Sequence, residues 1–469
     1  MQTRVAGLAT WTDNLTLQPV NRDAAVIATV SPGVTINSAS GLLTGNLDYS
    51  LNAIAYFKTQ QSSRFQNALS ANGVAELIDR RVFVDLRASI SQQTASAFGT
   101  QTVSPVLANE NRREVTNLSV SPYARGPLAG WATYEARVNA SRTQAGGSNL
   151  GAGNTTGGLL RLNGVASGSL NWYAQISEQR SSFAGTSGNR NGLQSVGLTY
   201  RPDVELQLGT NVGRERSDFL GGAQRTGASS GVNAQWSPTP RTQIAADVQR
   251  HDYGTAHNLS FQHRFARSVW QLVDATNVTL GNSGAPGGVR SNYDQYFLLF
   301  ASLEPDPIKR DVLVRSYLQS LGIAPDAAVS TGFLSAGPSR LHNQQATVTL
   351  QGPRSSITLL LGRTVTSRLG SNGASSGDLA LSPQVSQRSY SLSAGHQLSP
   401  TSSLSVTASR LASAGLGLGQ STQLTSWALN WNTKLGQRLS AQLGARHSRF
   451  ESVSGYAENA VYSSLTQQF

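Results

Sequence analysis

The sequence predicts an all-β fold: a transmembrane antiparallel up-and-down β-barrel of about 22 strands (range about 18–24) with one short helical insert. Three observations predict it. The composition fits neither a soluble nor a disordered chain, hydrophobicity has a period of two along most of the sequence, and the connections alternate between short and long. Together they indicate a single barrel over residues 1–469.

The chain carries little charge for its length. Of 469 residues, 38% are hydrophobic, 13% are charged and 46 are glycine, whereas a soluble domain has about 25% charged residues. A membrane barrel has this profile because each strand turns only every second residue toward lipid. No stretch approaches the roughly 18 apolar residues of a spanning helix. The absence of cysteine excludes disulfide scaffolds and thiolate zinc sites.

The net charge of +12 comes almost entirely from arginine, because Lys58, Lys309 and Lys434 are the only lysines. Arginine suits bidentate contact with carboxylates and phosphates. The arginines are spread singly along the chain and do not cluster with aromatic residues on one face. We therefore expect no nucleic acid as a partner.

Strands are predicted by strict alternation. Leu206 and Leu208 alternate with Glu205 and Gln207, and the same period runs from Leu439 onward. The segments are about 10–14 residues long, which suits tilted strands that cross a membrane. Tight connections at 201–203, 237–240, 265–268, 352–355, 398–401 and 434–437 alternate with longer ones at 143–156, 181–191, 217–229, 367–383 and 413–420.

Tryptophan marks the rim with the short connections, which in outer-membrane barrels is the periplasmic one. Indole rings prefer the boundary between lipid headgroups and acyl chains. We interpret the tryptophans that lie near short connections as one aromatic girdle: Trp131, Trp172, Trp236, Trp270 and Trp431.

Both ends of the chain bear on location. The final alternating segment stops on Phe469, which resembles the assembly signal of bacterial outer-membrane barrels, although Gln467 departs from its pattern. The barrel-assembly machinery is the partner this ending implies. No export signal precedes the first strand, so we expect the numbering to begin after signal removal.

Residues 281–340 interrupt the strand rhythm and predict a helical insert. Asp306 can cap a helix, Pro307 suits its first turn and Gly322 its end. The insert caps the mouth, plugs the lumen as a gate, or decorates the surface. The gate or plug candidates are Tyr293, Phe297, Phe300, Ile308, Val312, Leu318 and Leu321.

We find no catalytic constellation, so we expect no enzyme, no cofactor and no metal. His251, His257 and His263 could converge across a hairpin, but no HExxH motif or cysteine partner accompanies them. No nucleophile elbow and no phosphate-binding loop occurs in the required context.

The polar strand face is expected to line an aqueous lumen, where fixed positive charge would favour the passage of anionic solutes. In the alternative interpretation, some of these arginines pair with luminal acids or with lipid phosphates at the rims. Which face each residue occupies depends on register. The pore-lining candidates are Arg87, Arg137, Arg214, Arg363, Arg410, Arg438 and Arg446.

Several stretches resemble the outer-membrane β-barrel family associated with bacterial PEP-CTERM and exopolysaccharide gene clusters. They include Trp11–Leu15, Phe83–Ala88 and, as that family's helical insert, Phe300–Pro307. The resemblance implies a Gram-negative outer-membrane location and a part in exopolysaccharide export. It also implies contact with outer-membrane lipid and lipopolysaccharide, and it leaves room for a periplasmic polysaccharide-export protein as a partner.

Our first functional hypothesis is a passive channel that exports an acidic exopolysaccharide through an arginine-lined lumen. The alternatives are a general or anion-preferring diffusion porin, with loops folded into the lumen, and a non-conducting structural barrel that anchors surface polymer. TonB-dependent uptake is disfavoured because strands begin almost at the first residue, where such receptors carry a plug domain.

Overall fold

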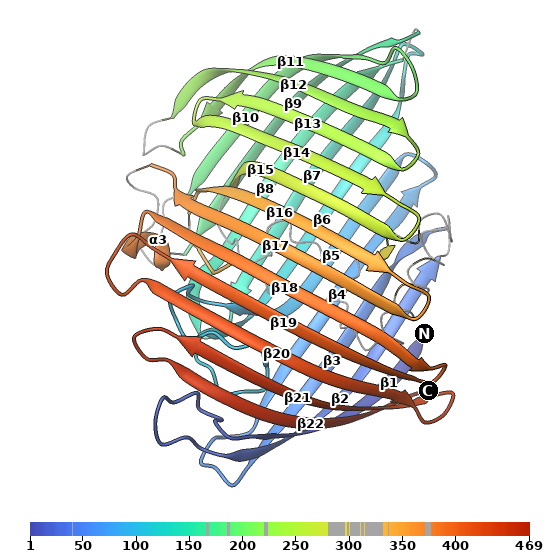
Figure 1. The fold of residues 1–469 in the computed structure, drawn as a ribbon. Helices are drawn as coiled ribbons and strands as arrows, with labels where there is room; N and C mark the ends of the chain where they lie inside the picture. Colours follow the sequence, from blue (N-terminus) through green and yellow to red (C-terminus); the bar gives the residue numbers. More distant parts are fainter. Residues whose placement is uncertain are drawn as a thin grey trace.

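The computed structural model describes residues 1–39, 41–165, 168–184, 188–219, 224–279, 296–297, 300, 310, 314, 332–335, 337–370 and 377–469. In this part of the chain, 22 strands form one antiparallel sheet that closes on itself (Figure 1). The predicted fold class is therefore confirmed.

The strands follow one another around the barrel in chain order, each paired with its neighbours. They are β1 (Gln2–Thr12), β2 (Ala25–Ala39), β3 (Leu43–Phe57), β4 (Arg64–Ile78), β5 (Val82–Thr94), β6 (Arg112–Leu128), β7 (Ala132–Ala145), β8 (Ser148–Gly164), β9 (Leu170–Phe183), β10 (Asn189–Tyr200), β11 (Leu206–Ser217), β12 (Arg225–Thr239), β13 (Thr242–His251), β14 (Gly254–Arg264), β15 (Ser268–Thr279), β16 (Ser339–Gln351), β17 (Ser355–Arg368), β18 (Gln384–Ser399), β19 (Ser402–Ala414), β20 (Ser421–Lys434), β21 (Leu439–Glu451) and β22 (Tyr456–Gln468).

The first and last strands close the sheet. β1 pairs with β22 from Arg4 opposite Gln468 to Thr12 opposite Ala460, and the two termini lie at the same end of the barrel (Figure 1). Closure matters because a sheet edge exposed to lipid would leave backbone N–H and C=O groups without partners.

The two rims differ as predicted. At the rim that carries the termini, connections range from 240–241 between β12 and β13 to 201–205 between β10 and β11. At the opposite rim the connections include 13–24, 95–111 and 369–383, the last containing the short helix α3 (Asp378–Leu381). No helix in the described ranges is long and apolar enough to cross a membrane.

One predicted long loop is instead a strand extension. Residues 143–156 continue β7 and β8 up to a tight turn at 146–147, where Gly147 has a φ of 69°. Glycine adopts this left-handed conformation without the strain that a Cβ would cause. The polar, glycine-rich sequence was therefore part of a long hairpin.

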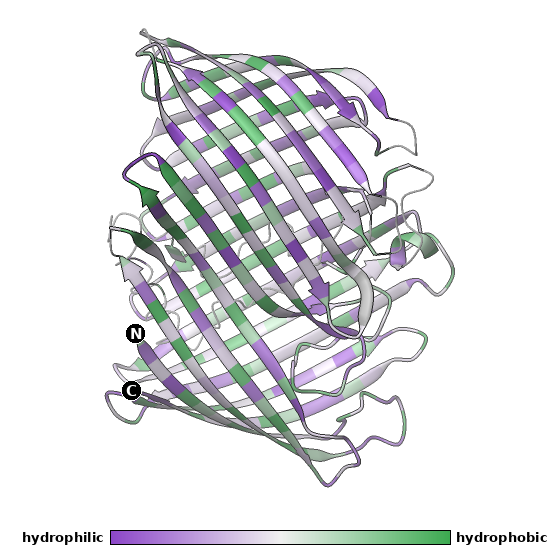
Figure 2. Cartoon of the chain, turned by 180° about the vertical axis from the view of Figure 1, so that it is seen from behind, coloured by the Kyte–Doolittle hydropathy of each residue, from purple (hydrophilic) through white to green (hydrophobic). Residues whose placement is uncertain are grey.

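Alternate residues on each strand face opposite sides of the wall. On β17 the side chains of Ile357, Leu359 and Leu361 are exposed, whereas those of Ser356 and Thr358 are buried. The exposed series belongs to the outer, convex face and the buried series to the lumen. Paired residues on neighbouring strands face the same side, so this assignment extends around the barrel. Hydropathy alternates along the strands in Figure 2. The outer face is therefore largely apolar, as a membrane-crossing barrel requires.

Glycines make room for aromatic rings on neighbouring strands. Gly197 lies opposite Tyr173, and Gly444 lies opposite Tyr462. A Cβ built on either glycine would overlap the facing ring. An aromatic ring over a strand glycine covers the exposed backbone and helps to fix the register.

We predict that Gly197→Ala destabilises the barrel by about 1–3 kcal/mol, because the added methyl displaces the Tyr173 ring. Gly192→Ala on the same strand is the matched control, since the nearest atom that its Cβ would meet is the Ser177 carbonyl oxygen at 3.8 Å. Urea unfolding of the detergent-solubilised protein measures both variants. Equal stability of the two variants would refute this account of Gly197.

Candidate functional site

The structure divides the predicted pore-lining arginines between the two faces. Arg87, Arg137 and Arg446 face the lumen, and Arg438 lies in the turn before β21, at the short-connection rim.

Arg214, Arg363 and Arg410 were wrongly assigned to the lumen. Each lies on the outer face, because it is an even number of residues from an outward apolar side chain on its own strand. Those neighbours are Val212 for Arg214 and Leu361 for Arg363. Arg410 follows Val406 and Ala408 on the outer face of β19 in the same way.

Most luminal arginines with an acidic neighbour are paired with it. Arg137 Nη1 lies 2.6 Å from Asp85 Oδ2, and Arg4 Nη2 lies 2.7 Å from Asp48 Oδ1. Arg446 Nη2 lies 2.7 Å from Glu458, which is fully buried. These contacts neutralise much of the luminal charge, in line with the alternative interpretation of these arginines.

One stretch of the luminal wall keeps positive charge beside aromatic rings. We call it the arginine–aromatic wall; it comprises Phe83, Arg87, Tyr123, Arg125, Arg137, Arg161 and Tyr173 on β5 to β9. The guanidinium carbons of Arg125 and Arg161 lie 4.6 Å from the ring centroids of Phe83 and Tyr173. Arg87 is exposed and makes no ion pair within the described part of the chain. This wall can offer weak, replaceable contacts to an anionic or sugar-like solute.

The connection 95–111 folds into the mouth of the barrel, and we call it the mouth loop. Its Val106 and Leu107 pack in a buried apolar cluster with luminal residues such as Ile54 and Phe450. The Tyr56 hydroxyl donates to the Val106 carbonyl oxygen at 2.8 Å. On the opposite flank, the Tyr456 hydroxyl donates to the Gln101 carbonyl oxygen at 2.6 Å. The loop therefore covers the inner wall between β3 and β22.

Helix α3 also holds the mouth loop, through hydrogen bonds to Asp378. The Ser96 hydroxyl and the Ala97 N–H donate to the Asp378 carboxylate at 2.6 and 2.5 Å. Burial raises the pKa of this carboxyl above its ordinary value, although these two hydrogen bonds act in the opposite direction. The Thr422 hydroxyl adds a bond to the Ala97 carbonyl oxygen at 3.0 Å. Sequence reasoning missed this loop; its only signal was the apolar Val103, Val106 and Leu107 within an otherwise polar connection.

The predicted insert is described only in part. Tyr293, Ile308, Val312, Leu318 and Leu321 lie outside the described residues. Tyr296, Phe297, Arg310 and Val314 are helical, and Tyr296, Phe300 and Val314 are buried.

The Tyr296 hydroxyl lies near Ser356 and Thr358 on the luminal face of β17. At this residue, the insert therefore lies inside the barrel wall. For Tyr296, this position is luminal and not a surface decoration.

The three histidines singled out in the sequence do not converge. His251 contacts luminal Glu215 at 2.9 Å, and His263 contacts Thr242 at 2.8 Å. His257 meets His342 instead, on the outer face, because β14 and β16 flank β15.

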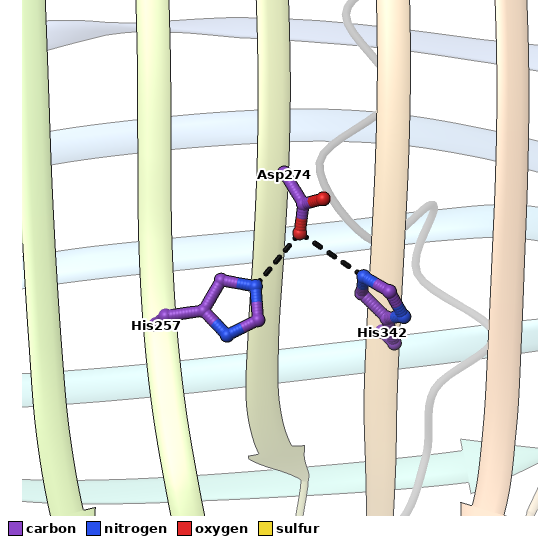
Figure 3. Close-up of side chains that lie close together, drawn as sticks. All are labelled: His257, Asp274 and His342. Carbon is purple, nitrogen blue, oxygen red and sulfur yellow. Dashed lines mark hydrogen bonds and ion pairs between the residues drawn. The ribbon is translucent and has the colours of Figure 1, made fainter.

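Both of these outer-face histidines point at one carboxylate oxygen (Figure 3). Asp274 Oδ1 lies 2.7 Å from His257 Nε2 and 3.0 Å from His342 Nε2. Their ligand atoms lie close enough together to hold a metal ion. The same contacts satisfy the three side chains as a hydrogen-bonded cluster.

Aromatic residues occupy the outer face near both rims. All five predicted girdle tryptophans are exposed near the short connections, and Trp131 stacks on Trp172 with ring centroids 5.9 Å apart. Trp11, Phe57 and Phe65 are exposed on the outer face near the opposite rim, whereas Trp427 is exposed midway along β20. Phe469 is exposed, and its N–H donates to the Thr3 carbonyl oxygen at 2.9 Å.

We predict that Tyr456→Phe loosens the mouth loop, because the Gln101 carbonyl loses its buried donor at a cost of about 1–3 kcal/mol. Hydrogen exchange of the amides at 96–108 should accelerate several-fold. Tyr390→Phe, on the exposed outer face, is the control and should leave these amides unchanged. Identical exchange in the two variants would show that the Tyr456 bond does not hold the loop.

No protein-family model matches the chain, and no curated protein matches it. Solved structures match at low identity. The FrpB iron transporter of Neisseria meningitidis (F5-1 variant, apoprotein form) is 9% identical with a TM-score of 0.49, covering 100% of this chain and 81% of that chain. The siderophore receptor PirA of Pseudomonas aeruginosa is 11% identical with a TM-score of 0.46, covering 100% and 80%. At these values the likeness says nothing about what passes through this barrel.

Proposed function

We propose that the protein is an outer-membrane channel through which an acidic exopolysaccharide leaves the cell passively. The closed barrel, its apolar outer face and the aromatic residues near both rims suit a membrane-crossing channel. Such barrels occur in the outer membrane of Gram-negative bacteria. There the barrel-assembly machinery would recognise Phe469.

The observation that carries the choice of solute is the arginine–aromatic wall. Its arginines are spaced along β5 to β8 and lie beside rings that can stack on sugars. Within the wall Arg137 is paired with Asp85 and Glu135. Arg87, Arg125 and Arg161 form no ion pair among the described residues, so these three arginines are where an anionic chain would find positive charge. Many weak contacts along a wall let a polymer slide without tight capture.

A diffusion porin is the second candidate, and the mouth loop favours it. A connection folded into the lumen, tied to strands on both sides, narrows a pore to a fixed size. An exporter of polymer needs this obstruction, or the insert, to move. The two functions therefore differ in whether the lumen must be opened before a polymer can pass.

We predict that deleting 291–322 raises single-channel conductance in a planar bilayer and yields an anion-selective pore. Acidic oligosaccharides should block this pore, and neutral ones should not. Arg87→Gln combined with Arg161→Gln should weaken the block at least about tenfold, because charge-assisted contacts are lost. Arg214→Gln, on the outer face, should leave the block unchanged.

Other outcomes identify the other functions. Steady conductance of the intact protein, with no effect of sugars, would establish the porin and contradict export. If neither the intact protein nor the deletion variant conducts, even after 98–108 is also shortened, the barrel is a structural anchor.

A further inference from the structure

We propose that the outer face of β14 to β18 binds a phosphate-bearing lipid of the surrounding membrane, with Arg363 and Arg388 holding the phosphate. This site is separate from the lumen, and a non-conducting barrel would carry it equally.

The arginine pair is the first observation. Arg363 on β17 lies directly opposite Arg388 on β18, and both side chains are exposed on the outer face. Like charges in directly opposed strand positions destabilise a sheet. Within the described ranges, neither guanidinium has a carboxylate partner. A bound anion removes this repulsion and uses the bidentate geometry of arginine.

Neighbouring positions extend the positive charge. Arg410 lies on the outer face of the next strand, opposite Tyr390, and its guanidinium donates to Gln423. On the other side, Gln344 lies opposite Arg363 and donates to Asp274. That acid is already contacted by His257 and His342 (Figure 3). It has partners of its own and forms no ion pair with Arg363 or Arg388.

Other outer-face arginines form ion pairs with a nearby acid of the chain. Arg180 and Arg190 both bind Glu178, at 2.8 and 2.9 Å, and Arg449 binds Glu451 at 2.9 Å. At these positions the chain supplies the anion itself. At Arg363 and Arg388 no acid of the described ranges supplies it, and a bound ligand can.

An apolar groove is the second, independent observation. A surface groove of about 620 Å³ runs from Arg363 and Arg388 over Leu361, Leu272, Phe261 and Leu259. Free phosphate would leave this apolar surface unused, whereas acyl chains would cover it. The occupant that fits both parts is an acidic lipid with its phosphate at the arginines and its chains along the groove.

The arrangement recurs elsewhere on the outer face. A groove of about 540 Å³ on β8 to β11 is lined by Ile176, Val196 and Val212 and is bordered by Arg214. Arg214 has no carboxylate partner among the residues that the structure describes. Both grooves place arginine on the long-connection side of an apolar surface, where lipid phosphates lie in an outer leaflet.

The test uses the full-length protein in non-ionic detergent, with native mass spectrometry as the readout. Three probes are compared: lipid A, lipid A without phosphates, and inorganic phosphate. We expect the protein to retain lipid A and to bind the other two at least about tenfold more weakly. Equal binding of dephosphorylated lipid A would overturn the role of the arginines, and equal binding of inorganic phosphate would overturn the role of the groove.

The variant Arg363→Gln/Arg388→Gln should lose at least about tenfold in affinity for lipid A, because two charge-assisted contacts are removed. Arg180→Gln/Arg190→Gln is the matched control, since this opposed outer-face pair already binds Glu178 and its loss should leave the affinity for lipid A unchanged. Unchanged affinity of the double variant would refute the proposal. If the double variant does not fold, the comparison of the three probes on the natural protein still decides.

Discussion

The pairing of β1 with β22 is the constraint on which the rest of the structure depends. It leaves no strand edge in contact with lipid, and it fixes the stagger of every strand relative to the next. Once the stagger is fixed, each side chain faces either lipid or lumen, because the period of a strand is two. A shift of one residue on any strand would exchange its apolar and polar faces.

This register separates the positive charge into two populations. Luminal Arg4, Arg137 and Arg446 are held by acids from other strands or from their own, so the interior carries less net charge than the composition suggests. Several outer-face arginines, by contrast, form no ion pair with any acid in the part of the chain that the structure describes. The excess of arginine is thus explained at least as well by contact with anionic lipid as by an anionic cargo.

The barrel was predictable from the sequence because alternation, connection lengths and tryptophan positions all report on the backbone. The face of an individual arginine was predictable only where alternation is clear. Arg214 follows Val212 at a spacing of two, so the sequence itself placed it on the apolar face, contrary to our assignment. Around Arg363, three consecutive leucines precede Gly362, and no pattern distinguishes the faces there.

The mouth loop was not predictable because its partners are remote in the chain. Barrel closure brings Tyr456 to the loop, and the connection between β17 and β18 brings Asp378 to it. No local sequence pattern encodes those contacts. An apolar loop narrows the mouth, and the arginine–aromatic wall on β5 to β9 gives one side of the lumen positive charge and aromatic rings. That geometry suits a solute that slides along one wall.

The assignment of faces supports both proposals, so it is the claim to measure most directly. Because the chain has no cysteine, single cysteines can be introduced along β17 and labelled with a nitroxide in the reconstituted protein. Accessibility to oxygen, which concentrates in lipid, is then compared with accessibility to a water-soluble nickel chelate. The structure predicts high oxygen accessibility at the outer positions Ile357, Leu359 and Leu361 and low oxygen accessibility at Ser356, Thr358 and Leu360. The reverse pattern, or no alternation, would contradict the register and everything built on it.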